Sequence, residues 1–93
     1  MKNYKKVYEV CYEVIGRKTG RRTMLFNDSK WFVSLDEAIA AVLLSMEKLK
    51  FVKLQEDTYD VKEFFLVNVN PPYELFKVHK DGSTNLIKNV AKA

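Results

Sequence analysis

Few side chains in this sequence are of the types that carry chemistry, and their spacing brings none of them together. Cys11 is the single cysteine and His79 the single histidine, so a structural zinc site with four such ligands cannot form. A general base at His79 needs a partner within hydrogen-bond reach, and the sequence indicates none. Glu9 and Glu13 share one face of an alternating segment with Cys11, where their charges would raise the thiol pKa. We therefore predict no catalytic residue, no metal site and no cofactor, and a protein that is not an enzyme.

An acidic cluster offers the nearest approach to a site for a hard cation. It consists of Glu56, Asp57, Asp60 and Glu63. The cluster lacks the spacing and the turn glycine of a calcium-binding loop. The sequence also contains no glycine-rich phosphate loop, nucleophile elbow or dinucleotide fingerprint. We interpret residues 55–60 as a polar, solvated loop.

A basic cluster is the feature that most favours a binding function. Its members are Arg17, Lys18, Arg21 and Arg22, and Lys30 follows near the next predicted turn. Four cations within six residues, at the tip of a predicted hairpin, would project together and could contact either nucleic-acid phosphates or an acidic protein patch. The alternative is a charged, solvated turn that protects against aggregation.

The first third of the chain reads as strands and turns. Residues 6–15 alternate between apolar and polar side chains, which predicts a strand with one buried face. Residues 16–20 carry two glycines and predict the hairpin connection to a second strand at 21–27. We expect a further turn at 27–30 and a short third strand at 31–33.

The helix signal is the strongest in the sequence. Residues 34–37 (Ser-Leu-Asp-Glu) form a capping box, in which the serine hydroxyl accepts from the amide of the glutamate. Apolar residues then recur at helical spacing on one stripe. The stripe consists of Leu35, Ile39, Val42, Leu43, Met46 and Leu49. These observations place a helix at about 34–50.

The last third of the chain returns to strands. Residues 61–70 are apolar on both faces in the middle, which predicts a strand near the sheet centre that ends at Pro71-Pro72. A strand at 73–79, a turn at Asp81-Gly82 and an edge strand at 84–88 follow. The predicted fold is α+β: an antiparallel sheet of four to six strands with one amphipathic helix on one face.

Length and composition fit one domain spanning residues 1–93. The chain is 47% hydrophobic and 30% charged, with a net charge of +4, which permits an anionic partner without requiring one. We recognise no signal peptide and no apolar run long enough for a membrane span. With one cysteine, the simplest expectation is a reducing, cytoplasmic location, that of a bacterial host cell if the chain is phage-encoded.

Residues 14–38 resemble the three-stranded, one-helix arm-site DNA-binding domains of phage-type integrases. The resemblance rests on the basic hairpin, the strand after it and the capped helix that begins at residues 34–38 (Ser-Leu-Asp-Glu-Ala). It implies DNA binding by the hairpin, although the strands after Phe51 depart from that family's pattern. In type, the whole chain is also similar to small bacteriophage accessory proteins, many of which mask a host protein, including inhibitors of restriction or CRISPR systems.

Two functions follow as hypotheses. The first is a non-catalytic, phage-type inhibitor that binds a host protein, such as a nucleic-acid-handling or defence complex, and blocks it sterically. The second is a nucleic-acid-binding module that uses the hairpin at 16–22. Trp31 and Tyr4 are candidate anchors in either case, because aromatic residues and arginine are enriched in binding hot spots, although Trp31 could instead belong to the core. A homodimer formed by edge-strand pairing is compatible with both.

Overall fold

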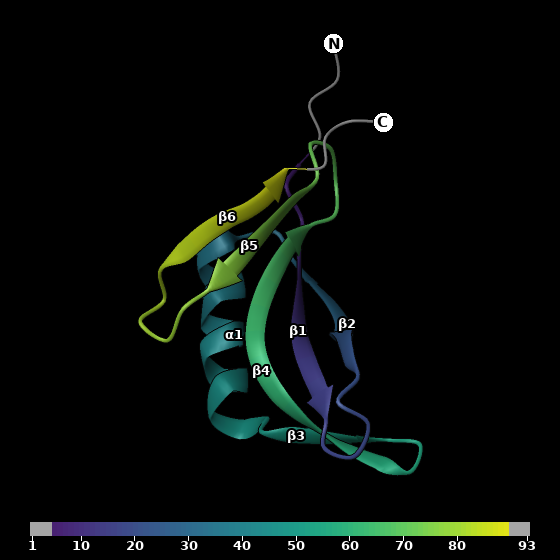
Figure 1. Ribbon diagram of the computed structural model, residues 1–93. Coiled ribbons are helices and arrows are strands. Elements are labelled where there is room, and N and C mark those ends of the chain that lie inside the picture. Colours follow the sequence, from purple (N-terminus) through teal and green to yellow (C-terminus); the bar gives the residue numbers. More distant parts are fainter. Residues whose placement is uncertain (1–4, 90–93) are drawn as a thin grey trace.

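The computed structural model describes residues 5–89, which form six strands and one helix (Figure 1). In chain order these elements are β1 (Tyr8–Gly16), β2 (Arg22–Phe32), α1 (Leu35–Lys48), β3 (Phe51–Leu54), β4 (Asp57–Asn68), β5 (Glu74–Val78) and β6 (Thr84–Asn89). All pairings are antiparallel, and the main strand order is β2-β1-β4-β5-β6. The predicted α+β fold is confirmed.

The long central strand β4 organises the sheet. It lies in the middle of the strand order, as its apolar sequence predicted. One of its edges pairs with β1 along most of its length. Its other edge pairs with two strands in turn: with β3 at residues 57–60 and with β5 at residues 64–68. On that edge the Val61 amide donates to the Lys50 carbonyl at 2.9 Å, just before β3, but residues 61–63 pair with no strand there. The sheet therefore contains a gap between β3 and β5.

The helix covers one face of the sheet and makes the core with it (Figure 1). Alternate residues of β1 supply one layer of that core: Tyr8, Val10, Tyr12 and Val14. Ala38 and Val42 of α1 are fully buried against this layer. The predicted capping box begins the helix, because the Ser34 hydroxyl accepts a hydrogen bond of 3.3 Å from the Glu37 amide.

Two local predictions were wrong. Residues 27–30 are a bulge inside β2 and do not form a turn before a third strand: Glu9 pairs with Trp31, but Cys11 already pairs with Phe26. The strand continues because pairing with β1 resumes after the bulge, an arrangement that the polar residues alone do not reveal. Residues 55–60 are not a loop either, since only 55–56 form the turn and β4 begins at Asp57. The missed strand β3 completes this second hairpin.

Candidate binding surface

The predicted basic hairpin lies directly beside the acidic residues of the β3–β4 hairpin. Arg17 donates to Asp60 from both Nε and Nη2, at 2.8–3.1 Å, and its guanidinium lies 5.8 Å from the ring centre of Phe51. A bidentate pair of this kind is strongly directional. The hydrogen bonds from Arg17 lower the pKa of Asp60, and the same contact raises the pKa of Arg17.

Asp57 holds the tip of the basic hairpin through backbone amides. The amides of Lys18 and Thr19 donate to its carboxylate at 3.2–3.4 Å, and the Thr58 amide donates at 2.8 Å. Although partial desolvation raises the pKa of Asp57, these hydrogen bonds together bring it below the usual value. The Lys18 ammonium donates to the Glu56 carbonyl at 3.2 Å. Asp57 and Asp60 therefore anchor the hairpin.

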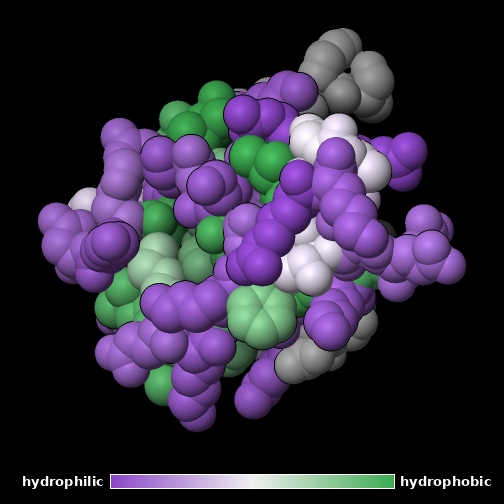
Figure 2. Space-filling view, turned by 60° about the horizontal axis from the view of Figure 1, so that its bottom comes forward, coloured by the Kyte–Doolittle hydropathy of each residue, from purple (hydrophilic) through white to green (hydrophobic). Residues whose placement is uncertain are grey.

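The other predicted cations are arranged differently. Arg22 pairs with Glu13 at 3.4 Å. Lys30 lies on the bulge with its ammonium 5.6 Å from the ring centre of Phe32. Arg21 is exposed, and within residues 5–89 the structure gives its side chain no ion pair. Hydrophilic side chains cover most of this end of the molecule, with apolar ones visible between them (Figure 2).

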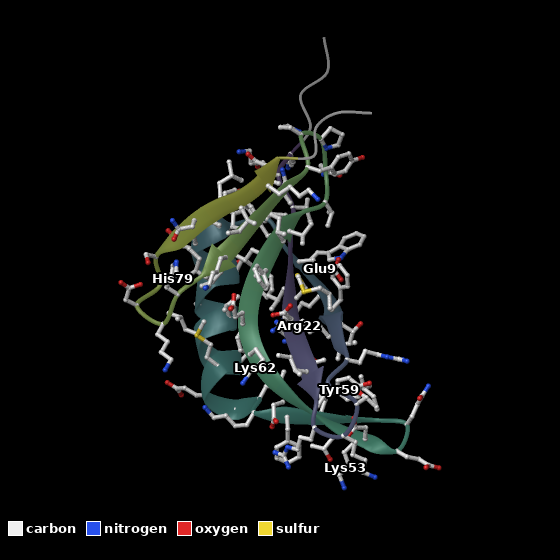
Figure 3. The ribbon with its side chains drawn as sticks, in the orientation of Figure 1. Glu9, Arg22, Lys53, Tyr59, Lys62 and His79 are labelled. Carbon is white, nitrogen blue, oxygen red and sulfur yellow. The ribbon has the colours of Figure 1, made fainter. Side chains whose placement is uncertain are left out.

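The sheet face that points away from α1 is a second candidate surface, which we call the open face. Residues directly opposite one another in a register share a face, so the pairings define its members. They include Met24, Phe26 and Trp31 of β2, Glu9, Cys11 and Glu13 of β1, Glu63, Phe65 and Val67 of β4, and Leu75 and Lys77 of β5. The same pairings place Arg22 of β2 opposite Ile15 and Lys88 of β6 opposite Leu75 on this face. Figure 3 labels Glu9 on β1 and Arg22 at the start of β2.

Apolar side chains are prominent on the open face. Trp31 is 63% exposed, Phe26 53% and Met24 41%. The registers place Phe26, Cys11 and Phe65 in one row across three strands, and Trp31 lies in the adjacent row. Cys11 is only 1% exposed in this row even though the helix lies on the other face. Phe26 of β2 and Phe65 of β4 thus lie on either side of the buried Cys11 of β1, in one apolar row across the three strands.

The open face carries several carboxylates among these apolar residues. Glu63 pairs with Lys77 at 3.2 Å, while Glu9 and Glu13 lie on the same face along β1. Burial, and secondarily the charge of Glu9, raises the pKa of the Cys11 thiol to about 12. The thiol therefore stays protonated near neutral pH. The direction agrees with the sequence prediction, although burial and not the neighbouring glutamates is the larger cause.

The structure places the remaining candidates as follows. Trp31 belongs to the open face and not to the core, whereas Tyr4 lies outside the described residues. The side chain of His79 hydrogen-bonds to Asn85 of β6. Among residues 5–89, no group of three or more His, Cys, Asp or Glu side chains is arranged to hold a metal ion.

Sequence reasoning missed Phe26 and Met24 as surface residues. Their alternation with Leu25, which packs on the core, was the available signal, since it predicts that they point away from the helix. Comparison of the chain with protein-family models, curated proteins and solved structures found no match. In the part of the chain that the structure describes, no helix has the length and apolar character needed to cross a bilayer.

Proposed function

We propose that this chain is a non-catalytic interaction module that binds another protein through the open face. The observation that carries the proposal is the exposure of Phe26 and Trp31 together on a sheet face that points away from the helix. Extended apolar surface of this kind on a small domain marks an interaction site. Aromatic side chains are also enriched at protein–protein interfaces.

The charges on this face favour a protein partner over nucleic acid. Glu9, Glu13 and Glu63 carry carboxylates among the apolar side chains, and these would repel phosphates. Base stacking on exposed aromatic residues requires cations along the same surface to hold the nucleic-acid backbone. Here Lys77 and Arg22 are already paired with glutamates, while Lys88 lies at the far edge of the face on β6.

In its more specific form, the proposal makes the chain an inhibitor that covers a functional surface of a host protein, in the manner of the bacteriophage accessory proteins. Steric masking requires only a stable, complementary surface and no reacting group. Phe26 and Trp31 are carried by β2, which pairs with β1 on both sides of the bulge. Side chains held on a paired strand lose less conformational entropy on binding than those of a free segment.

The test compares capture of partners by the native chain with capture by two variants. The Phe26→Thr/Trp31→Thr variant removes the exposed aromatic rings but keeps residues that favour strands. Leu44→Gln is the matched control, because Leu44 is 52% exposed on the helix, away from the sheet. Each protein is immobilised and exposed to bacterial lysate, and bound proteins are identified and quantified by mass spectrometry.

We expect one stoichiometric partner on the native chain and on Leu44→Gln, and its loss from the double variant. Equal capture by all three proteins would overturn the assignment of the open face, and no stoichiometric partner would overturn the proposed function. Light scattering on the native chain identifies the case in which the partner is a second copy. Nuclease treatment of the lysate separates direct binding from bridging by nucleic acid.

A further inference from the structure

The gap in the sheet between β3 and β5 opens into a pocket with a volume of about 370 Å³. Residues 61–63 of β4 form its wall, because β3 pairing stops at Asp60 and β5 pairing begins at Phe64. The last turn of α1 lies behind the gap. In Figure 3, Lys62 on β4 and His79 at the end of β5 lie on either side of this opening.

The floor of the pocket is apolar. Met46 and Leu49 of the helix line it together with Val61, Phe64 and Val78 of the sheet. Small-molecule sites usually have volumes of roughly 300–1,000 Å³, so this pocket lies near the lower limit. It therefore suits one or two bulky side chains better than a large ligand.

The rim of the pocket is strongly cationic. Four lysines line it, namely Lys50, Lys62, Lys77 and Lys80, against a single carboxylate from Glu63. Glu63 is already paired with Lys77, at 3.2 Å. The pocket thus carries an excess of positive charge beside an apolar floor.

Two of these lysines are available for a ligand. Lys50 donates to the Met46 carbonyl at 2.9 Å and so caps the helix. Lys62 and Lys80 are exposed, and within residues 5–89 the structure gives neither of them an ion pair. Lys62 contributes to the lowered pKa of Asp60, although Arg17 already binds that carboxylate.

The acidic neighbours leave the positive charge in excess. Glu47 is the one carboxylate in the adjoining depression, which it shares with Lys50 and Lys80. Lysines therefore outnumber carboxylates in both depressions.

We propose that this pocket binds an acidic side chain of a partner peptide together with a bulky apolar side chain next to it. The carboxylate would lie between Lys62 and Lys80, and the apolar group would contact the floor. This inference rests on the proposed function in taking the ligand to be part of a protein. A peptide is favoured because Glu63 and Lys77 belong both to the pocket and to the open face, so one partner can occupy both.

The test uses blocked dipeptides titrated into the isotope-labelled full chain, with amide chemical shifts as the readout. One dipeptide contains glutamate and phenylalanine, and its matched partner contains glutamine and phenylalanine. Phenylacetate represents a free carboxylate on an apolar body. The variant Lys62→Glu/Lys80→Glu reverses the two available charges. Lys53→Glu reverses one charge at an exposed lysine of β3 outside the pocket and is the control for charge reversal elsewhere on the surface.

We expect the glutamate dipeptide to shift amides around the pocket and to bind the Lys62→Glu/Lys80→Glu variant at least about tenfold more weakly. The native affinity should be retained by Lys53→Glu. Equal binding of the glutamine dipeptide, equal loss in Lys53→Glu, or shifts confined to another surface would overturn the inference. If phenylacetate binds as tightly as the dipeptide, the ligand of the pocket is a small carboxylate and the peptide assignment is overturned.

The same titration on Phe26→Thr/Trp31→Thr separates the pocket from the open face. The pocket inference predicts an unchanged affinity for the glutamate dipeptide, because neither residue lines the pocket. If the pocket binds the glutamate dipeptide but Phe26→Thr/Trp31→Thr still captures the partner protein, the proposed function alone is contradicted. If the pocket does not bind the dipeptide but that variant loses the partner protein, the pocket inference alone is contradicted.

Discussion

The hairpin end and the open face differ in whether their prominent side chains have interaction partners within the chain. At the hairpin end, Arg17 and Asp60 bind one another, and Asp57 accepts from the amides of Lys18 and Thr19. On the open face, Phe26 and Trp31 remain more than half exposed. Charged groups whose partners lie within the chain have less to offer another molecule, whereas exposed rings can still bury apolar surface. The comparison therefore favours the open face as the binding surface.

The first prediction contrasts the core between the helix and the sheet with the open face on the other side of the sheet. Val42 is fully buried and Phe26 is half exposed, although both are apolar. Val42→Asp places an unpaired charge in the core and should cost about 4–5 kcal/mol, close to the whole stability of a small domain. Phe26→Thr should change the free energy of unfolding by less than about 1 kcal/mol. Urea denaturation followed by circular dichroism measures both, and a native-like transition for Val42→Asp would contradict the helix packing.

The second prediction concerns the anchoring of the hairpin. A Cβ at Gly16 would lie 2.6 Å from both Asp57 Oδ2 and Thr19 Oγ1, and 3.2 Å from a ring carbon of Tyr59. Gly16→Ala should therefore destabilise the fold by about 1–3 kcal/mol, as overpacking does elsewhere.

Thermal unfolding of Gly16→Ala, Asp57→Ala and the double variant tests this account. Because both changes disrupt the same contact, the double variant should lose less than the sum of the single losses. Strict additivity would show that Asp57 is not the group displaced.

The sequence carried enough information for the overall fold but not for the hairpin end. The helix at 35–48 followed from its capping box and apolar stripe, and the central position of β4 followed from its apolar residues. Both signals are local and are read within one element. The pairing of Arg17 with Asp60 joins residues 43 positions apart, so it depends on the register between β1 and β4. The gap between β3 and β5 likewise depends on where the pairings of those two strands with β4 end, which no single element reveals.

The third prediction uses the lowered pKa values of Asp57 and Asp60. A carboxyl whose pKa is lower in the folded than in the unfolded chain contributes stability above its unfolded pKa, about 3.9 for aspartate. That contribution is lost as the pH falls through the folded-state pKa. The urea midpoint should consequently decline on acidification below about pH 4.5, and more steeply in the native chain than in Asp57→Asn/Asp60→Asn. Parallel declines would show that other carboxylates control acid unfolding.

The fourth prediction has the smallest expected effect. It tests directly whether the open face or the hairpin end is the binding surface. If the hairpin cations are largely satisfied within the chain, they should bind DNA or RNA only weakly and at low salt. The variant in which Arg17, Lys18, Arg21 and Arg22 are replaced by alanine should then differ little from the native chain near physiological salt.

Fluorescence anisotropy with labelled single-stranded DNA, double-stranded DNA and RNA across a salt series measures this. A protein that contacts several phosphates shows a logarithmic affinity slope close to the number of contacts. A steep slope that disappears in the variant would mean that the Arg17–Asp60 pair opens in favour of phosphate. The hairpin would then replace the open face as the main binding surface, because a bidentate arginine gives up one anionic partner only for another that binds at least as well.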